Sequence, residues 1–150
     1  MKLFKNTHYL IKELVRSSIF FNYLYLFFFD KKRIITDENI AVVGFPRVGN
    51  TFAGRVVKIG FGVRKIKLVH HYHSSAQAIN SVKSGIPTVL VIRKPLDAIL
   101  SLFISFPKQD NYYISAHILR FIIYHLRIYF YSSKMLIITF EEFSDNPNII

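Results

Sequence analysis

The stretch AVVGFPRVGNTF, residues 41–52, places a turn bounded by two glycines directly after a run of apolar residues. Its spacing fits the phosphate-binding pattern G-x-x-x-x-G-K-[ST] at both glycines and at Thr51, but Asn50 stands where the pattern has lysine. A cation occurs earlier, at Arg47. A turn between a buried strand and a helix presents main-chain N–H groups to an anion, so we expect a strand, a phosphate-binding loop and a helix here. Taken alone, the match also fits an ordinary strand-to-helix turn.

Apolar runs of strand length recur outward from this loop and alternate with helical segments. The predicted strands cover residues 40–45, 66–71, 88–92 and 134–140. The predicted helices cover residues 8–29, 51–59, 74–83, 96–106 and 111–131, and one more is expected after the SDNPN stretch at 144–148. This alternation is typical of an α/β domain with a parallel sheet and crossover helices. We therefore predict one domain over 1–150, with its core at 40–150 and its ligand site at the carboxyl ends of the strands.

The chain has the composition of a folded domain with a strong basic excess. Its 150 residues are 51% hydrophobic, which is the opposite of a disordered composition. The net charge of +11 favours anionic partners, although compositional drift would produce the same excess. Nucleic acid is not expected as a partner, because no basic recognition helix or aromatic-basic motif occurs. The absence of cysteine excludes disulfides and thiolate metal sites and fits a reducing compartment, here the cytoplasm.

The hydrophobic segment at 8–29 decides whether the chain contacts a membrane. Its apolar core, residues 19–29, has about half of the ~20 residues that a spanning helix needs. Cationic residues lie on both sides of this core, and no small-residue cleavage site of a signal peptide follows Phe29. We expect a helix that packs on the domain or contacts a membrane surface, rather than one that crosses the bilayer.

The loop resembles that of a known enzyme family. FPRVGNTF, residues 45–52, is similar to the loop Y-P-K-S-G-T-T-W of the sulfotransferases that use 3′-phosphoadenosine 5′-phosphosulfate (PAPS). The resemblance implies a three-layer α/β/α fold of the P-loop nucleoside triphosphate hydrolase type, with a loop that binds the 5′-phosphosulfate end of PAPS. The loop residues that it implies for this role are Arg47, Val48, Gly49, Asn50, Thr51 and Phe52. Arg47 takes the place of the family's lysine, which also follows proline directly.

A second segment resembles the part of the same family that binds the 3′-phosphate. LVIRKPLDAILSLF, residues 90–103, is similar to the family's strand-R-x-P-x-D-x-x-x-S. The resemblance implies that Arg93, at the end of the strand, and Ser101, eight residues later on the next helix, hold the 3′-phosphate. A solvated loop arginine and a buried helix serine are the alternative. A third segment, MLIITFEEFSDNP at 135–147, is similar to the family's strand followed by Y-E-D-L-x-x-D-P, and we expect only a structural role for it.

Three histidines follow the second predicted strand, in LVHHYHSS at 68–75. The resemblance implies a catalytic histidine at a strand end roughly two dozen residues before the 3′-phosphate arginine. His71 and His70 precede Arg93 by 22 and 23 residues, so the general base is expected at His71, with His70 next, and His73 is expected to contact the substrate. A metal site at His71 and His73, or three polar residues at a strand end, are the alternatives.

These features together predict a PAPS-dependent sulfotransferase that moves a sulfuryl group to the hydroxyl of a carbohydrate, a lipid or a small alcohol. Arg47 and the loop amides would stabilise charge on the leaving phosphate, and no metal is expected. Two departures from the family, an arginine for the loop lysine and the lack of its C-terminal R-K-G segment, leave an inactive homologue open. The alternative function is a non-catalytic, basic, membrane-associated or anion-binding protein. A nucleotide kinase is disfavoured because Asn50 replaces the lysine.

Overall fold

The fold, taken from a computed structural model, is described for residue 11 and for residues 18–29, 40–60, 66–69, 73–107 and 111–146. The strands are β1 (Ile40–Val43), β2 (Leu68–Val69), β3 (Thr88–Ile92) and β4 (Leu136–Thr139). The helices are α2 (Ile19–Phe29), α3 (Asn50–Gly60), α4 (Ser75–Lys83), α5 (Pro95–Ser105), α6 (Asn111–Tyr129) and α7 (Phe140–Asp145), with a short 3-10 helix η2 (Ser132–Lys134).

The strands form a parallel sheet in the order β2-β1-β3-β4. The register pairs Val42 of β1 with Val89 of β3, and Val91 of β3 with Ile138 of β4. Every residue of β1 is buried, as expected for an inner parallel strand covered on both faces. The predicted parallel sheet is confirmed, and the strand that carries the loop lies inside it.

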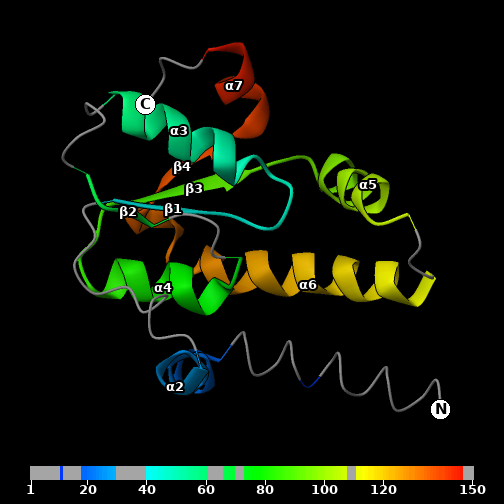
Figure 1. Cartoon of the computed structure of the whole chain (residues 1–150), viewed down its shortest axis with the longest axis horizontal. Helices are drawn as coiled ribbons and strands as arrows, with labels where there is room; N and C mark the ends of the chain where they lie inside the picture. Colours follow the sequence, from blue (N-terminus) through cyan, green and yellow to red (C-terminus); the bar gives the residue numbers. More distant parts are fainter. Residues whose placement is uncertain are drawn as a thin grey trace.

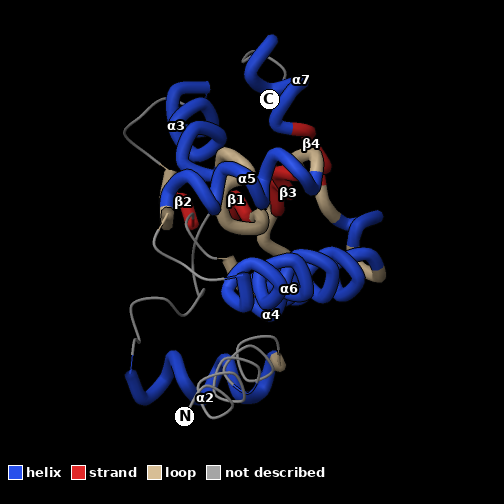
Figure 2. Tube along the Cα trace, turned by 90° about the vertical axis from the view of Figure 1, so that its right-hand side faces the viewer, coloured by secondary structure: helices blue, strands red, loops and turns tan. Residues whose placement is uncertain are grey.

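Helices cover both faces of this sheet. Figure 1 shows α3 and α7 above the sheet and α4 and α6 below it, with α2 on the far side of α4, against which it packs. Figure 2, a view turned by 90°, shows the same two helical layers and places α5 in front of the strands. The chain is therefore an α/β protein with helices on both faces of a parallel sheet, and α5 lies beyond the ends of β1 and β3.

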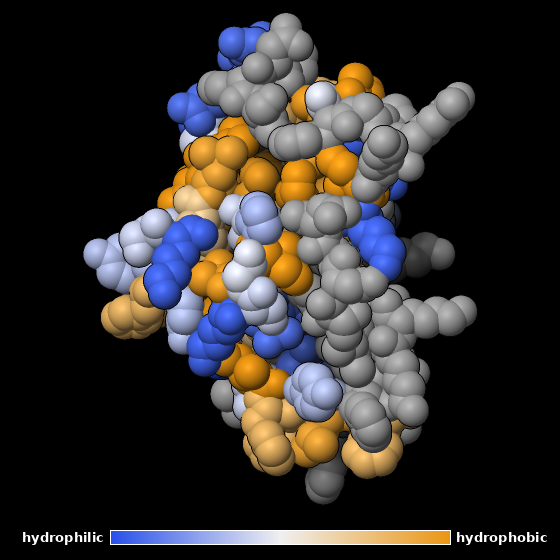
Figure 3. Space-filling view, turned by 90° about the vertical axis from the view of Figure 1, so that its left-hand side faces the viewer, coloured by the Kyte–Doolittle hydropathy of each residue, from blue (hydrophilic) through white to orange (hydrophobic). Residues whose placement is uncertain are grey.

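Aliphatic strand residues and a few aromatic rings fill the core. Phe45, two residues after β1, is fully buried and meets Phe121 edge to face, with ring centroids 5.1 Å apart. Phe143 of α7 and Ile128 of α6 close the core from opposite faces of the sheet. Figure 3 shows the end of the molecule opposite α5, where apolar side chains reach the surface between hydrophilic ones.

The predicted helix at 8–29 is interrupted at Ser18. Ser18 is not helical, and its carbonyl oxygen accepts the hydrogen bond of the Asn22 N–H at 2.9 Å, which begins α2 at Ile19. Residues 8–10 and 12–17 of the predicted helix lie outside the described residues, and Ile11 between them is helical. None of the described helices is both long and apolar enough to cross a membrane.

Helix α7 was not predicted, and it precedes the helix that we expected after the SDNPN stretch at 144–148, where residues beyond 146 lie outside the described part of the chain. It begins at Phe140. The cause is a capping box, in which the Thr139 hydroxyl accepts a hydrogen bond from the Glu142 N–H at 3.1 Å and the Glu142 carboxylate accepts one from the Thr139 N–H at 3.1 Å. The predicted strand at 134–140 is correspondingly shortened to Leu136–Thr139.

Candidate functional site

Residues at the carboxyl ends of the four strands form the candidate site. The turn at 44–49 follows β1, His73 comes four residues after β2, Arg93 follows β3, and Phe140 follows β4. Parallel strands bring these positions to one edge of the sheet, which is where α/β sheets bind ligands.

The turn after β1 depends on two residues with left-handed backbone. Arg47 has φ 69° and Gly49 has φ 97°. Left-handed backbone is accessible to glycine but costs a non-glycine residue about 1 kcal/mol or more, so Arg47 is held under strain. The Arg47 side chain is exposed, which leaves its charge available to a ligand.

The first turn of α3 completes the loop. The Ala53 N–H donates to the Gly49 carbonyl at 3.0 Å, so the helix itself provides no acceptor for the N–H groups of Asn50, Thr51 and Phe52. These N–H groups and the helix dipole present partial positive charge at the end of the turn.

Arg93 and Ser101 both contact the loop through Arg47. Nη1 of Arg93 donates to the Arg47 carbonyl oxygen at 3.1 Å, and Nε of Arg47 donates to Oγ of Ser101 at 3.3 Å. The two segments that the resemblance assigns to opposite ends of one nucleotide are therefore in direct contact. Nε of Arg93 is buried without a hydrogen-bond acceptor. The two guanidinium groups form no ion pair with any carboxylate in the described part of the chain, so positive charge accumulates here.

Asn50 stabilises the base of the loop instead of reaching toward a ligand. Its side chain is buried, and Nδ2 donates to the Gly44 carbonyl oxygen at 2.9 Å. Nδ1 of His73 lies 3.1 Å from that same oxygen and 3.1 Å from Nδ2 of Asn50. A Cβ on Gly44 would collide with Asn50 and Val48, so residue 44 must be glycine for this packing. The structure thus places Nδ1 of His73, which we expected to contact the substrate, against the Gly44 carbonyl and the Asn50 amide.

The remaining loop residues differ in what they offer a ligand. Val48 is fully buried in the core, so only its main chain is available. Thr51 is exposed. Phe52 is 40% exposed and meets Phe143 of α7 edge to face, with ring centroids 4.9 Å apart.

The predicted general bases, His71 and His70, lie outside the described residues. Within the described ranges, no three side chains of His, Asp or Glu lie close enough together to hold a metal ion.

Phe140 is a site residue that the sequence analysis missed. Its ring lies under the Arg93 guanidinium, whose central carbon is 4.5 Å from the ring centroid. The other side of the site meets the same ring, because a Cβ on Gly49 would collide with it. The available signal was its position directly after β4, at the same sheet edge as the loop.

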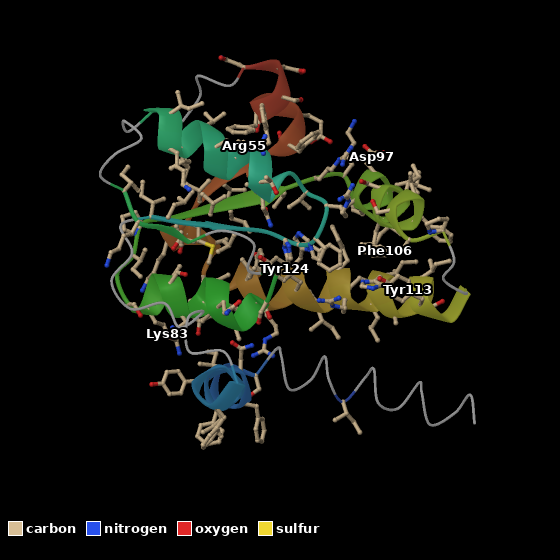
Figure 4. The ribbon with its side chains drawn as sticks, viewed as in Figure 1. Arg55, Lys83, Asp97, Phe106, Tyr113 and Tyr124 are labelled. Atoms are coloured by element: carbon tan, nitrogen blue, oxygen red, sulfur yellow. The ribbon has the colours of Figure 1, made fainter. Side chains whose placement is uncertain are left out.

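A histidine that the sequence analysis did not consider, His117, lies on α6. Burial, together with the nearby Arg120, lowers the pKa of His117 from 6.5 to about 4, so the ring is neutral at pH 7. His117 and Tyr113 line a small apolar cavity between α5 and α6 (Figure 4 shows Phe106 and Tyr113 at this junction). The arrangement is that of a core histidine, and no contact joins it to Arg47 or Arg93.

Comparison of the chain with protein-family models, with curated proteins and with solved structures finds no match. The geometry of the loop and of Arg93 therefore has to support any proposal about function.

Proposed function

We propose that this chain is a sulfotransferase that binds PAPS at the carboxyl edge of its sheet, in a domain of the P-loop nucleoside triphosphate hydrolase type. The observation that carries the proposal is the contact of Arg93 with the Arg47 carbonyl, together with that of Arg47 with Ser101. The two groups of residues that we propose to bind phosphates are therefore neighbours, as one doubly phosphorylated nucleoside would require. When bound, PAPS would supply the sulfuryl group.

The residues present fit such a ligand. The exposed Arg47 and the first-turn N–H groups of α3 would bind the 5′ end, and Arg93 with Ser101 would bind the 3′-phosphate. The buried Nε of Arg93 has no acceptor, and a phosphate oxygen would satisfy it. Arginine suits this role because its fork of N–H donors matches phosphate oxygens.

The position of Asn50 supports sulfuryl over phosphoryl transfer. In the phosphate-binding pattern a lysine at this position reaches the terminal phosphates. Here the side chain is a buried amide that bonds to Gly44, so the loop offers Arg47 as its cation instead. The loop consequently lacks the usual lysine partner of a triphosphate.

In the proposed reaction, the oxygen of an acceptor hydroxyl forms a bond to sulfur while the bond from sulfur to the phosphate oxygen breaks. The hydroxyl proton passes to His71 or His70, which are outside the described residues. Arg47 and the N–H groups of the loop stabilise the negative charge on the leaving phosphate. The nucleotide product is adenosine 3′,5′-bisphosphate.

Isothermal titration calorimetry with adenosine 3′,5′-bisphosphate tests the proposal without knowledge of the acceptor. We expect micromolar or tighter binding, at least tenfold tighter than binding of adenosine 5′-monophosphate or of ATP. Equal affinity for the three nucleotides, or no binding, contradicts the proposal.

The lack of cysteine fits a reducing compartment, and we propose the cytoplasm as the location.

A second candidate function, a basic protein that binds membrane surfaces without catalysis, is favoured by one observation on α2. Phe20 is 66% exposed and Phe28 is 70% exposed, while Asn22 on the opposite side is buried. An aromatic helix face on a chain of net charge +11 suits the surface of an anionic bilayer. Sedimentation with phosphatidylserine vesicles tests it. Binding that is lost in Phe20→Ser/Phe28→Ser and retained in Arg93→Ala supports this function.

A further inference from the structure

The ring of Phe140 contacts two segments that are far apart in the sequence. The Arg93 guanidinium lies over the ring, 4.5 Å from its centroid. The ring also occupies the space that a Cβ on Gly49 would need. One aromatic side chain from β4–α7 therefore contacts both groups of the proposed anion site.

Two features of the fold fix the position of this ring. The register pairs Thr139 of β4 with Ile92 of β3, so Phe140 and Arg93 leave neighbouring strands at the same level. The capping box between Thr139 and Glu142 then sets the start of α7 at Phe140, and the Thr139 hydroxyl also donates to Oε2 of Glu142 at 2.7 Å. The backbone of Phe140 is thus constrained on both sides.

We infer that Phe140 is a positioning residue, whose ring holds the Arg93 guanidinium by a cation–π contact in the orientation from which it donates to the Arg47 carbonyl. A guanidinium over an aromatic face is attracted by the ring quadrupole, and the attraction grows when the pair is shielded from water. Through this contact Phe140 couples the loop after β1 to the arginine after β3. The ligand of the coupled site rests on the proposed function, whereas the coupling itself does not.

A ring that merely filled space would be replaceable by any apolar side chain of similar size. A cation–π contact requires the aromatic face, so tyrosine preserves it and leucine or methionine removes it. Phe106, a partly exposed ring that tilts against Tyr113 at the end of α5, offers a matched control outside the site. The substitutions Phe140→Tyr, Phe140→Leu, Phe140→Met and Phe106→Leu therefore separate the two roles.

The first measurement needs no ligand. Phenylglyoxal modifies accessible arginines, and peptide mass spectrometry follows its rate at Arg93. We expect Phe140→Leu to raise the rate at least about threefold, and Phe140→Tyr and Phe106→Leu to leave it unchanged. Phe140→Met replaces the leucine variant if urea unfolding shows that the latter does not fold. An unchanged rate in the folded variant that lacks the ring overturns the inference.

The second measurement is titration with adenosine 3′,5′-bisphosphate and adenosine 5′-monophosphate. We expect Phe140→Leu to weaken binding of the bisphosphate about tenfold and that of the monophosphate less, because the contact acts on Arg93. Equal losses for both nucleotides overturn the positioning role. If the wild-type protein binds neither nucleotide, the proposed function fails, and the modification rate alone decides the role of Phe140.

Discussion

The side chain of Arg93 contacts the main chain of Arg47, since Nη1 of Arg93 donates to the Arg47 carbonyl oxygen at 3.1 Å. A cation at the end of β3 therefore supports the backbone of the loop after β1, and the Arg47 side chain is left to extend toward Ser101. The contact makes Arg93 a structural partner of the loop as well as the proposed ligand of the 3′-phosphate.

Replacement of Arg93 should separate these two roles. We expect Arg93→Ala to weaken binding of adenosine 3′,5′-bisphosphate by about 100-fold, because a charge-assisted contact is lost. Binding of adenosine 5′-monophosphate should fall only a fewfold, through the loss of support for the loop. Arg93→Lys keeps the charge without the fork and should recover little of the difference. Calorimetry measures all three affinities, and losses that are the same for both nucleotides argue against the 3′-phosphate role.

Gly49 should tolerate no side chain. An alanine there would have φ near 97° and a Cβ against the Phe140 ring, so we expect the free energy of unfolding to fall by about 2–3 kcal/mol. In a Phe140→Leu background the collision is relieved and only the backbone strain remains, so the cost should shrink. Urea unfolding of the single and double variants measures this, with Gly60→Ala, whose Cβ would meet nothing within 4 Å, as the control. Strictly additive costs contradict the contact between Gly49 and the ring.

The capping box at Thr139 should contribute measurably to stability. Thr139→Ala removes the acceptor of the Glu142 N–H, and we expect a loss of about 1 kcal/mol in the free energy of unfolding. Thr139→Ser keeps the hydroxyl and should retain most of the stability. The hydrogen bonds from Thr139 lower the pKa of Glu142, so the wild-type advantage over the alanine variant should diminish as the pH falls through the titration of Glu142. If urea unfolding shows that the stability difference between the wild-type protein and Thr139→Ala does not change with pH, the Glu142 carboxylate has no role in the capping box.

His117 should make the protein less stable in mild acid. Because its pKa is about 4 in the folded chain and near 6.5 in the unfolded one, the unfolded state binds the extra proton between these values. The free energy of unfolding should therefore drop by about 3 kcal/mol as the pH falls from 7 to 4, relative to a His117→Gln variant. The pKa of His125 is also lowered, so the comparison of the two proteins, rather than the wild-type curve alone, isolates His117. Parallel curves would show that His117 titrates normally.

Local sequence patterns predict the strands well because buried parallel strands are short, apolar and bounded by turn residues. TVLVI at 88–92 has these properties and is β3 without a change of limits. The rule that ligands bind at strand ends then brings Arg47 and Arg93 to one edge without any knowledge of side-chain contacts. The start of α7, which we did not predict, also had a local signal, because Thr139 and Glu142 have the spacing of a capping box.

Contacts across the sheet are harder to predict. Phe140 reaches Arg93 and Gly49 because β4 pairs with β3, and nothing in the sequence around Phe140 specifies its neighbouring strand. The inward orientation of Asn50 likewise depends on the Gly44 carbonyl and on His73, which lies 23 residues away in the sequence. These contacts depend on which strands pair and on which side chains become buried. The spacing of residues along the sequence indicates only where helices and strands form.

The left-handed backbone of Arg47 has a practical consequence for engineering. Glycine adopts that conformation without strain, so Arg47→Gly would remove the strain at this position together with the loop's cation. A library of variants selected for heat resistance alone would accordingly enrich glycine at position 47 and discard the charge. Directed evolution of this chain should score ligand retention in the same round as melting temperature.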